Sequence, residues 1–147
     1  FNRGGDLASD LVMFLTGRKT RNNTSDHFLV STEPLFRWTK PSVLLACEAN
    51  YSDGACFAYD YRTLNMGKLV GMPVPGSCTW MTGQSLQDES MHFSVPALGV
   101  KTLDGRYMEN VQLFPDIQVM NSYGTVSEGR DIQLEKAIEE LMKETEK

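Results

Sequence analysis

Ser52 is the residue of this sequence best placed to do chemistry, because it lies between a predicted buried strand and a predicted helix. Residues 43–47 form an apolar run typical of a strand in a parallel sheet, and Phe57 and Tyr61 begin a helical repeat. A serine at such a turn can expose its hydroxyl beside backbone N–H groups, as an acyl-transfer nucleophile requires. The competing interpretation is that Ser52 or Asp53 only caps the helix, and no G-x-S-x-G motif decides between them.

Two further features could assist such a nucleophile. Gly4 and Gly5 precede a predicted helix, and their backbone N–H groups could help to hold the oxyanion of a tetrahedral intermediate. Glu109 follows a predicted hairpin strand and could orient a histidine in a catalytic relay. Each feature also has an ordinary interpretation, because glycines serve tight turns and most such glutamates are solvated surface residues.

A serine nucleophile normally needs a base, and the sequence contains two histidines, His27 and His92. His27 lies in an irregular segment and His92 in a predicted strand, so a structural role is the favoured interpretation for both. Two histidines without a pattern of cysteine or carboxylate ligands also disfavour a zinc site. We therefore expect no metal, and nothing in the chain requires an organic cofactor.

The three cysteines, Cys47, Cys56 and Cys78, show neither the C-x-x-C spacing of a zinc or redox site nor the density of a small disulfide-rich domain. Their number is odd, and a chain of 147 residues can bury an adequate core without covalent cross-links. We therefore expect all three to be free and buried.

The composition describes one ordinary globular domain, since 41% of the 147 residues are hydrophobic and the net charge is -5 at pH 7. The acidic balance argues against a general binder of nucleic acid. The apolar runs fall far below the roughly 20 residues needed to cross a bilayer, so the chain is not expected to span a membrane. The sequence opens with Phe1 rather than Met, which suggests a piece of a longer protein. Any targeting signal would then lie outside this sequence, so the cellular compartment is not predicted from it.

Helix-like and strand-like patterns alternate along the chain, which predicts an α/β fold. We expect a helix from about residue 7 to Gly17, followed by an irregular crossover with one short strand at residues 27–30. Further strands are expected at residues 43–47 and 69–71. The continuous apolar run at residues 43–47 predicts a strand that is buried on both faces.

In the second half, Asp104-Gly105 predicts the turn of a hairpin between residues 91–100 and 106–108. A strand is expected at residues 117–119, and Asp131 can cap a final helix. The apolar residues of that helix form one stripe, with glutamates and lysines on the other faces; the stripe consists of Leu134, Ala137, Ile138, Leu141 and Met142.

An ordered set of motifs resembles the tail-specific, or C-terminal processing, serine peptidases, and within them the tricorn-like branch. Each motif is modest alone, but together they follow the order of that family and cover nearly the whole chain. They are Phe1-Asn2-Arg3-Gly4-Gly5 at the end of a D-x-R-x-N-x-G-G motif, Val43-Leu44-Leu45 with Asn50-Tyr51-Ser52-Asp53-Gly54, Gly67-Lys68-Leu69-Val70-Gly71 with Pro75-Gly76, Glu109-Asn110, Pro115-Asp116-Ile117, and Gly129-Arg130-Asp131 with Leu134 and Ala137.

The resemblance implies a role for each candidate residue. Ser52 would be the nucleophile, and Glu109 would be the acidic member of the catalytic relay. The amide of Asp53 and one amide from Gly4 or Gly5 would form the oxyanion hole.

One departure from the family pattern concerns the base. The position of the lysine base in the tail-specific branch is occupied here by Ser77, and Lys68 lies too early to replace it. The tricorn-like branch instead uses a histidine upstream of the D-x-R-x-N-x-G-G motif. The resemblance therefore implies that the base comes from a segment outside this chain, and that the fragment alone is nearly inactive.

On this resemblance, residues 1–147 are the C-terminal part of a serine peptidase catalytic domain, an incomplete portion of the ClpP/crotonase-like spiral of β-β-α units. The upstream catalytic subdomain and a PDZ-like module would precede it, and a peptide or protein would be its substrate. A place in the bacterial periplasm or cell envelope would follow the general habits of the family, and assembly as a homo-oligomer is left open.

Two alternatives belong to other functional classes. The same fold occurs in retinoid-binding proteins related to this family, so the parent could be a retired peptidase that binds peptides or apolar ligands. Retention of Ser52, Gly4-Gly5 and Glu109 together argues against retirement. The blander alternative is a role in interdomain packing or oligomer assembly.

Overall fold

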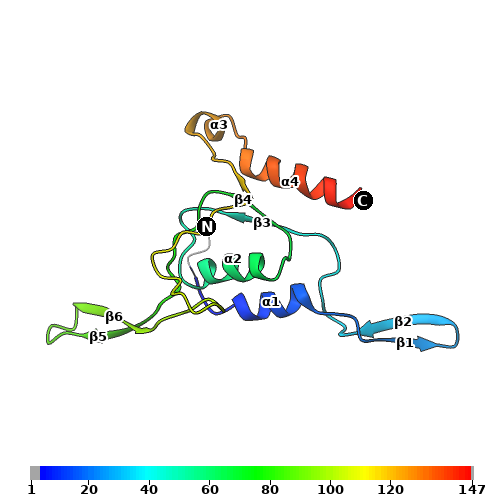
Figure 1. Cartoon of the computed structure of the whole chain (residues 1–147), viewed down its shortest axis with the longest axis horizontal. Coiled ribbons are helices and arrows are strands. Elements are labelled where there is room, and N and C mark those ends of the chain that lie inside the picture. Colours follow the sequence, from blue (N-terminus) through cyan, green and yellow to red (C-terminus); the bar gives the residue numbers. More distant parts are fainter. Residues whose placement is uncertain (1–3, 147) are drawn as a thin grey trace.

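A three-stranded parallel sheet forms the centre of the computed structural model, which describes residues 4–146 (Figure 1). Its strands are β3 (Val43–Ala46), β4 (Lys68–Gly71) and β7 (Ile117–Gln118), in the order β3-β4-β7. Parallel neighbours cannot be joined by a tight turn, so each connection crosses over the sheet. The first crossover contains the helix that follows Ser52, and it places the candidate nucleophile at the carboxyl end of β3.

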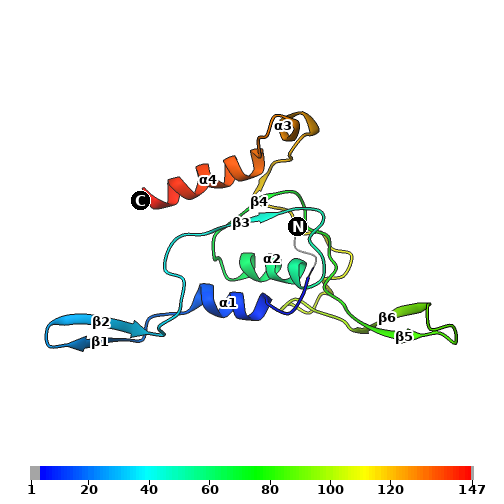
Figure 2. The same ribbon diagram turned by 180° about the vertical axis from the view of Figure 1, so that it is seen from behind.

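Helices lie on both faces of this sheet (Figures 1 and 2). The helix α2 (Asp53–Thr63) packs on one face and α4 (Ile132–Thr145) on the other, while α1 (Ala8–Thr16) packs against α2. A short helix, α3 (Tyr123–Ser127), precedes α4. The mixed α/β class predicted from the sequence is therefore confirmed, and the layers order as α1, α2, sheet and α4.

Two hairpins extend from opposite ends of the molecule (Figure 1). One pairs β1 (Arg21–Ser25) with β2 (Phe28–Glu33), and the other pairs β5 (Trp80–Ser85) with β6 (His92–Leu98), both antiparallel. The side chains of β5 and β6 are exposed throughout. The hairpins therefore add little to the core, which lies between α2 and the sheet.

The core is built mainly from α2, β4 and the segment that follows β4. Small side chains such as Ala58 let α2 approach the sheet, and larger ones fill the space beside them. Tyr61, Leu69 and Val74 are at most 2% exposed, and the Tyr61 hydroxyl is hydrogen-bonded to the Ser42 hydroxyl at 2.8 Å. This core holds α2 in place, and the position of Ser52, directly before α2, depends on it.

Several sequence predictions differ from the structure. The segment expected to be an irregular crossover with one strand contains the complete β1–β2 hairpin. The hairpin expected around Asp104-Gly105 is reduced to an isolated bridge between Lys101 and Tyr107, and β6 pairs with β5 instead. β3 is an edge strand rather than one buried on both faces, and its Leu45 is 39% exposed.

The final helix begins as predicted, because the Asp131 carboxylate accepts a hydrogen bond from the Leu134 N–H at 2.9 Å. Only part of its apolar stripe is covered in the structure, because Ala137 is buried but Ile138 is 51% exposed. Glu140 is buried instead, where it meets Lys68 of β4. Among residues 4–146 no helix is both long enough and apolar enough to cross a membrane.

Candidate active site

Ser52 occupies the turn between β3 and α2 in a conformation that non-glycine residues rarely adopt, with φ 53° and ψ -126°. It stands at the N-cap position of α2, yet its side chain makes no capping hydrogen bond to the helix. Such backbone strain costs of order 1–3 kcal/mol and is found where the surroundings hold a residue for a purpose. The capping interpretation is therefore wrong for Ser52, whose hydroxyl is left to point elsewhere.

The first backbone N–H of α2 is available beside Ser52. The N–H groups of Gly54 and Ala55 donate to the carbonyl oxygens of Tyr51, at 3.0 Å, and Ser52, at 2.9 Å. Among residues 4–146, the Asp53 N–H donates no backbone hydrogen bond. A helix N-terminus carries partial positive charge, so this amide suits a developing oxyanion.

Gly4 lies directly against the turn that contains Ser52. A Cβ atom at Gly4 would come within 2.8 Å of the Ser52 Cβ and 3.1 Å of the Tyr51 carbonyl oxygen. Gly4 also has φ 110° and Gly5 φ 138°, in the region that favours glycine. The structure thus brings the predicted oxyanion-hole glycines to Ser52, while Phe1, Asn2 and Arg3 of the same motif lie outside the described residues.

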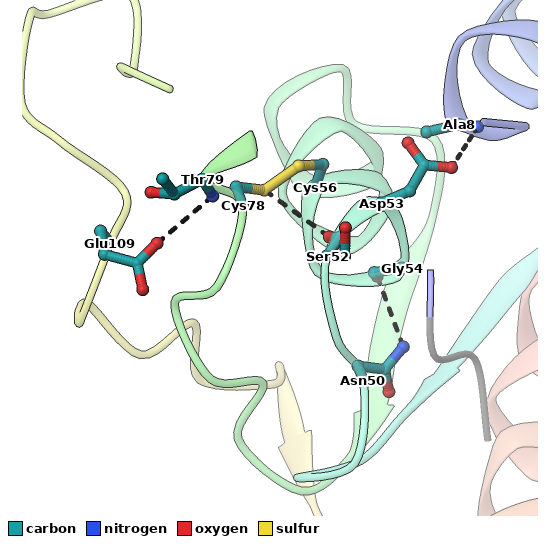
Figure 3. The surroundings of a disulfide bond; sticks show 9 residues. All are labelled: Ala8, Asn50, Ser52, Asp53, Gly54, Cys56, Cys78, Thr79 and Glu109. Carbon is teal, nitrogen blue, oxygen red and sulfur yellow. Dashed lines mark hydrogen bonds between the residues drawn. A yellow bond between two sulfur atoms is a disulfide. The ribbon is translucent and has the colours of Figure 1, made fainter. Parts of the chain in front are cut away.

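Asp53 and Asn50 hold the turn from two sides (Figure 3). The Asp53 carboxylate points away from Ser52 and accepts the Ala8 N–H at the start of α1, at 2.9 Å. The buried Asn50 side chain accepts the Cys47 N–H at 2.8 Å and donates to the Gly54 carbonyl oxygen at 3.4 Å. These contacts tie α1, β3 and α2 to one turn and so position the Ser52 backbone.

The carboxylate of Asp53 also influences the electrostatics of α2. Asp60 lies farther along the same helix, and its pKa is raised above the ordinary value, first by burial and then by the nearby negative charge of Asp53. The Asp53 carboxylate thus places acidic charge at the start of α2, on the side where it meets the Ala8 N–H of α1.

A disulfide joins Cys56 of α2 to Cys78, which corrects the prediction that all three cysteines are free. Only Cys47 is a free thiol among residues 4–146. The prediction failed because the fold brings the two cysteines together, with their Cα atoms 5.6 Å apart. They are 22 residues apart in the sequence, so no short cysteine motif indicates the bond. The Cys78 Sγ lies 3.8 Å from the Ser52 carbonyl oxygen, so the bridge borders the candidate site.

Glu109 is exposed and lies on the far side of this bridge from Asp53 (Figure 3). Its Oε2 accepts the backbone N–H of Thr79, the residue after Cys78, at 3.3 Å. A second bond from the Asn110 N–H to the Gly76 carbonyl oxygen, at 2.9 Å, holds the same loop. Glu109 is thus attached to the segment that the disulfide joins to the Ser52 helix, rather than to Ser52 itself.

The two histidines are not brought to Ser52. His27 lies in the turn between β1 and β2, and His92 begins β6 beside the turn of the other hairpin, so both are exposed on the hairpins of Figure 1. Lys68 binds Glu140 of α4, with Nζ and Oε2 2.5 Å apart. Ser77, at the place of the family lysine, has a buried Oγ without a hydrogen-bond partner in the described part of the chain.

A small pocket of about 110 Å³ opens at Ser52. Its described lining combines the Ser52 turn, the start of the chain and the disulfide, and it comprises Gly5, Asp6, Ser52, Asp53, Cys56, Cys78 and Trp80. This lining supplies a hydroxyl and backbone amides but includes neither a histidine nor a lysine. The arrangement can present a serine and backbone amides, and acyl transfer at this pocket would require a base from outside its described lining.

Sequence reasoning missed the roles of four residues that hold this site: Asn50, Thr79, Cys56 and Cys78. Asn50 enters the sequence analysis only as part of the motif around Ser52, and its spacing from Ser52 could have suggested that it braces the turn. Thr79 acts through its backbone N–H, which no side-chain motif reveals.

Comparison with known proteins defines the class to which this fold and site belong. Residues 1–119 match the model of peptidase family S41, so the chain belongs to that family. The resemblance to C-terminal processing and tricorn-like peptidases, stated from the motifs, is thereby confirmed.

Individual relatives agree with this assignment. The chain is 29% identical over 153 residues to a tricorn-like protease C-terminal subunit of Sulfurisphaera tokodaii, covering 99% of this chain and 17% of that protein. The crystal structure of the tricorn protease superimposes with a TM-score of 0.86 at 21% identity, covering 98% of this chain and 14% of that one. The photosystem II D1 C-terminal processing protease gives a TM-score of 0.56 at 16% identity, covering 81% and 32%.

These structural matches show that the fold is shared with solved proteases. The chain spans less than a fifth of the tricorn-like relative and of the tricorn structure. The match therefore corresponds to a limited part of each relative.

Proposed function

We propose that the protein is a serine peptidase that hydrolyses peptide bonds through an acyl-enzyme on Ser52. The observation that carries this proposal is the Ser52 turn, which has positive φ, no capping bond from its side chain, and a glycine backbone packed against it. Family membership supports the same activity. In this proposal residues 1–147 are the C-terminal part of the catalytic domain, and the upstream subdomain and a PDZ-like module belong to the same parent chain.

The proposed reaction proceeds in two stages. The Ser52 Oγ attacks the scissile carbonyl carbon while a base removes its proton, and the resulting oxyanion accepts hydrogen bonds from the Asp53 amide and from an amide of Gly4 or Gly5. The protonated base then gives its proton to the leaving amine, which leaves an ester on Ser52. A water molecule, deprotonated by the same base, hydrolyses that ester and releases the second product.

The base is proposed to be a histidine from a segment upstream of this chain. The pocket lining contains no histidine or lysine among its described residues, and both histidines of the chain lie on the exposed hairpins. Glu109 would then orient that histidine and stabilise its protonated form. Loss of a general base costs about 10²–10⁴ in rate, so the isolated chain is expected to be nearly inactive.

Peptide hydrolysis by the full-length protein tests this proposal. Wild type and Ser52→Ala are compared on denatured casein, with the new amino termini measured by a fluorogenic amine reagent. We expect turnover by wild type only. Equal turnover by Ser52→Ala at matched purity would exclude Ser52 as the nucleophile.

One observation favours a second candidate, the ligand-binding module. A pocket of about 210 Å³ shares Cys78 with the pocket at Ser52, and mainly apolar residues such as Val74, Met108 and Val111 line it. The buried Ser77 Oγ also lines this pocket and has no partner in the described part of the chain. An absent base at the upstream histidine position, together with saturable binding of a fluorescent fatty acid, would favour this candidate over the peptidase.

A further inference from the structure

The two halves of the proposed catalytic machinery lie on different segments of the chain. Ser52 belongs to the start of α2, whereas Glu109 is held by residues 76–79 through the Thr79 N–H and the Gly76 carbonyl oxygen. Residues 76–79 and the Glu109 loop thus form one hydrogen-bonded unit. The relative position of Ser52 and Glu109 depends on how this unit is attached to α2.

The Cys56–Cys78 disulfide makes that attachment. Cys56 lies in the first turn of α2 and Cys78 in the unit that holds Glu109, and their Cα distance of 5.6 Å falls in the range of about 4.4–6.8 Å usual for disulfides. Apart from the contact of Cys78 with the Ser52 carbonyl oxygen, no hydrogen bond among residues 4–146 joins residues 50–56 to this unit. The disulfide is therefore the one covalent link between the two halves of the site within the described residues, and it adds to the apolar packing of Cys78 and Val74 in the core beside α2.

The bridge is also open to reagents that reach the nucleophile. Both cysteines line the pocket that opens at Ser52, together with Gly5 and Trp80. Cys78 is only 2% exposed, but Cys56 is partly exposed. A small dithiol that enters the pocket can therefore reach the Cys56 sulfur.

We propose that the Cys56–Cys78 disulfide is a reversible positioning bridge. When it is oxidised, it keeps Ser52 and Glu109 in the relative positions that catalysis requires, and when it is reduced, those positions are lost and Ser52 becomes less reactive. This inference rests on the proposed peptidase function. A thiolate of a dithiol attacks the Cys56 sulfur and forms a mixed disulfide, and the Cys78 thiolate leaves and takes up a proton. The second thiol of the reductant then displaces Cys56, so two electrons and two protons reach the protein and the reductant departs as a cyclic disulfide.

The rate at which a fluorophosphonate modifies Ser52 in the full-length protein tests the inference. The oxidised protein is compared with protein reduced by dithiothreitol, and intact mass follows the modification with time at several reagent concentrations. A displacement of about 1 Å can cost about 10²-fold in rate, so we expect reduction to slow modification by about 10-fold to 10²-fold. Removal of the reductant and reoxidation should restore the rate.

The form of the loss separates positioning from unfolding. Loss of register lowers the rate constant at saturating reagent while all molecules are finally modified. Partial unfolding would instead lower the fraction of molecules modified, and circular dichroism would report it.

Cysteine variants complete the test. The double variant Cys56→Ser/Cys78→Ser should react slowly with or without dithiothreitol, whereas Cys47→Ser should retain the full response. Equal rates for oxidised and reduced wild type would overturn the inference and leave the peptidase proposal standing, as would alkylation of Cys56 and Cys78 in unreduced protein. No modification of Ser52 in the oxidised protein would overturn both.

Discussion

Gly4 packs against Ser52 so closely that a Cβ atom at Gly4 would lie 2.8 Å from the Ser52 Cβ and 3.3 Å from the Ser52 Oγ. Two segments far apart in the sequence thus meet at Ser52, where we propose the oxyanion hole. The close approach explains why glycine stands at position 4, because any side chain would displace either this backbone or the Ser52 turn.

Substitution Gly4→Ala is expected to lower the rate of Ser52 modification by fluorophosphonate by about 10²-fold or more, since loss of one oxyanion donor typically costs about 10²–10³. The matched control is Gly129→Ala, because Gly129 also has positive φ but a Cβ there would meet nothing within 4 Å. Both variants carry backbone strain, so a similar slowing in both would show that strain, and not proximity to Ser52, causes the loss.

The strained backbone of Ser52 predicts that replacing this residue with glycine raises stability while activity is lost. Glycine adopts positive φ without the penalty of a side chain, so Ser52→Gly is expected to unfold with a free energy about 1 kcal/mol higher than Ser52→Ala. Both variants should lose peptide hydrolysis. Urea denaturation followed by circular dichroism measures the difference, and a Ser52→Ala variant as stable as Ser52→Gly would contradict the strain inferred at this turn.

Glu109 is predicted to matter for reactivity and little for stability. Its exposed side chain accepts one hydrogen bond at 3.3 Å, so Glu109→Gln should change the free energy of unfolding by less than about 1 kcal/mol. Loss of the negative charge should slow peptide hydrolysis by about 10²-fold or more in the full-length protein. Glu89→Gln in the exposed turn between β5 and β6 is the control. Hydrolysis at the wild-type rate in Glu109→Gln would remove Glu109 from the relay.

The contact between α4 and β4 predicts a dependence of stability on acid pH. Hydrogen bonds from Lys143 and Lys68 lower the pKa of Glu140 from its ordinary value of 4.5 to about 2. Because the folded-state pKa is the lower one, the interaction stabilises the protein fully above a pH of about 4.5 and is lost as the pH falls toward 2.

The thermal unfolding temperature of wild type should fall between these pH values, and that of the Glu140→Gln variant should fall by less. Exposed Glu128→Gln serves as the control and should follow wild type. If Glu140→Gln and wild type declined in parallel, the ion pairs of Glu140 would not contribute to stability.

The sequence predicted the elements around Ser52 because their signals are local. The apolar run before the turn, the helical repeat of Phe57 and Tyr61, and the Asp131 cap each depend on neighbouring residues. The motif order also predicted the family, which the comparison confirmed.

The features that sequence reasoning missed depend on contacts between distant residues. The Cys56–Cys78 bridge and the burial of Glu140 against Lys68 arise only when the fold brings separate segments together. The β5–β6 hairpin, by contrast, is a local pairing that begins at Ser85 and His92. It was missed because the turn signal at Asp104-Gly105 predicted another partner for residues 91–100, where the structure forms only an isolated bridge. The roles of Ser52, Asp53, Glu109 and the two glycines stay predictions.

The most direct test of the central claim is fluorophosphonate labelling of the full-length protein beside the isolated 147-residue chain, with peptide mapping of the modified residue. The proposal predicts that Ser52 is labelled in the full-length protein and that the isolated chain is labelled far more slowly, because the base lies upstream. Equal labelling of Ser52 in both would place the base within this chain or in a second copy of it. Absence of label from Ser52 in the full-length protein would contradict its role as an activated nucleophile.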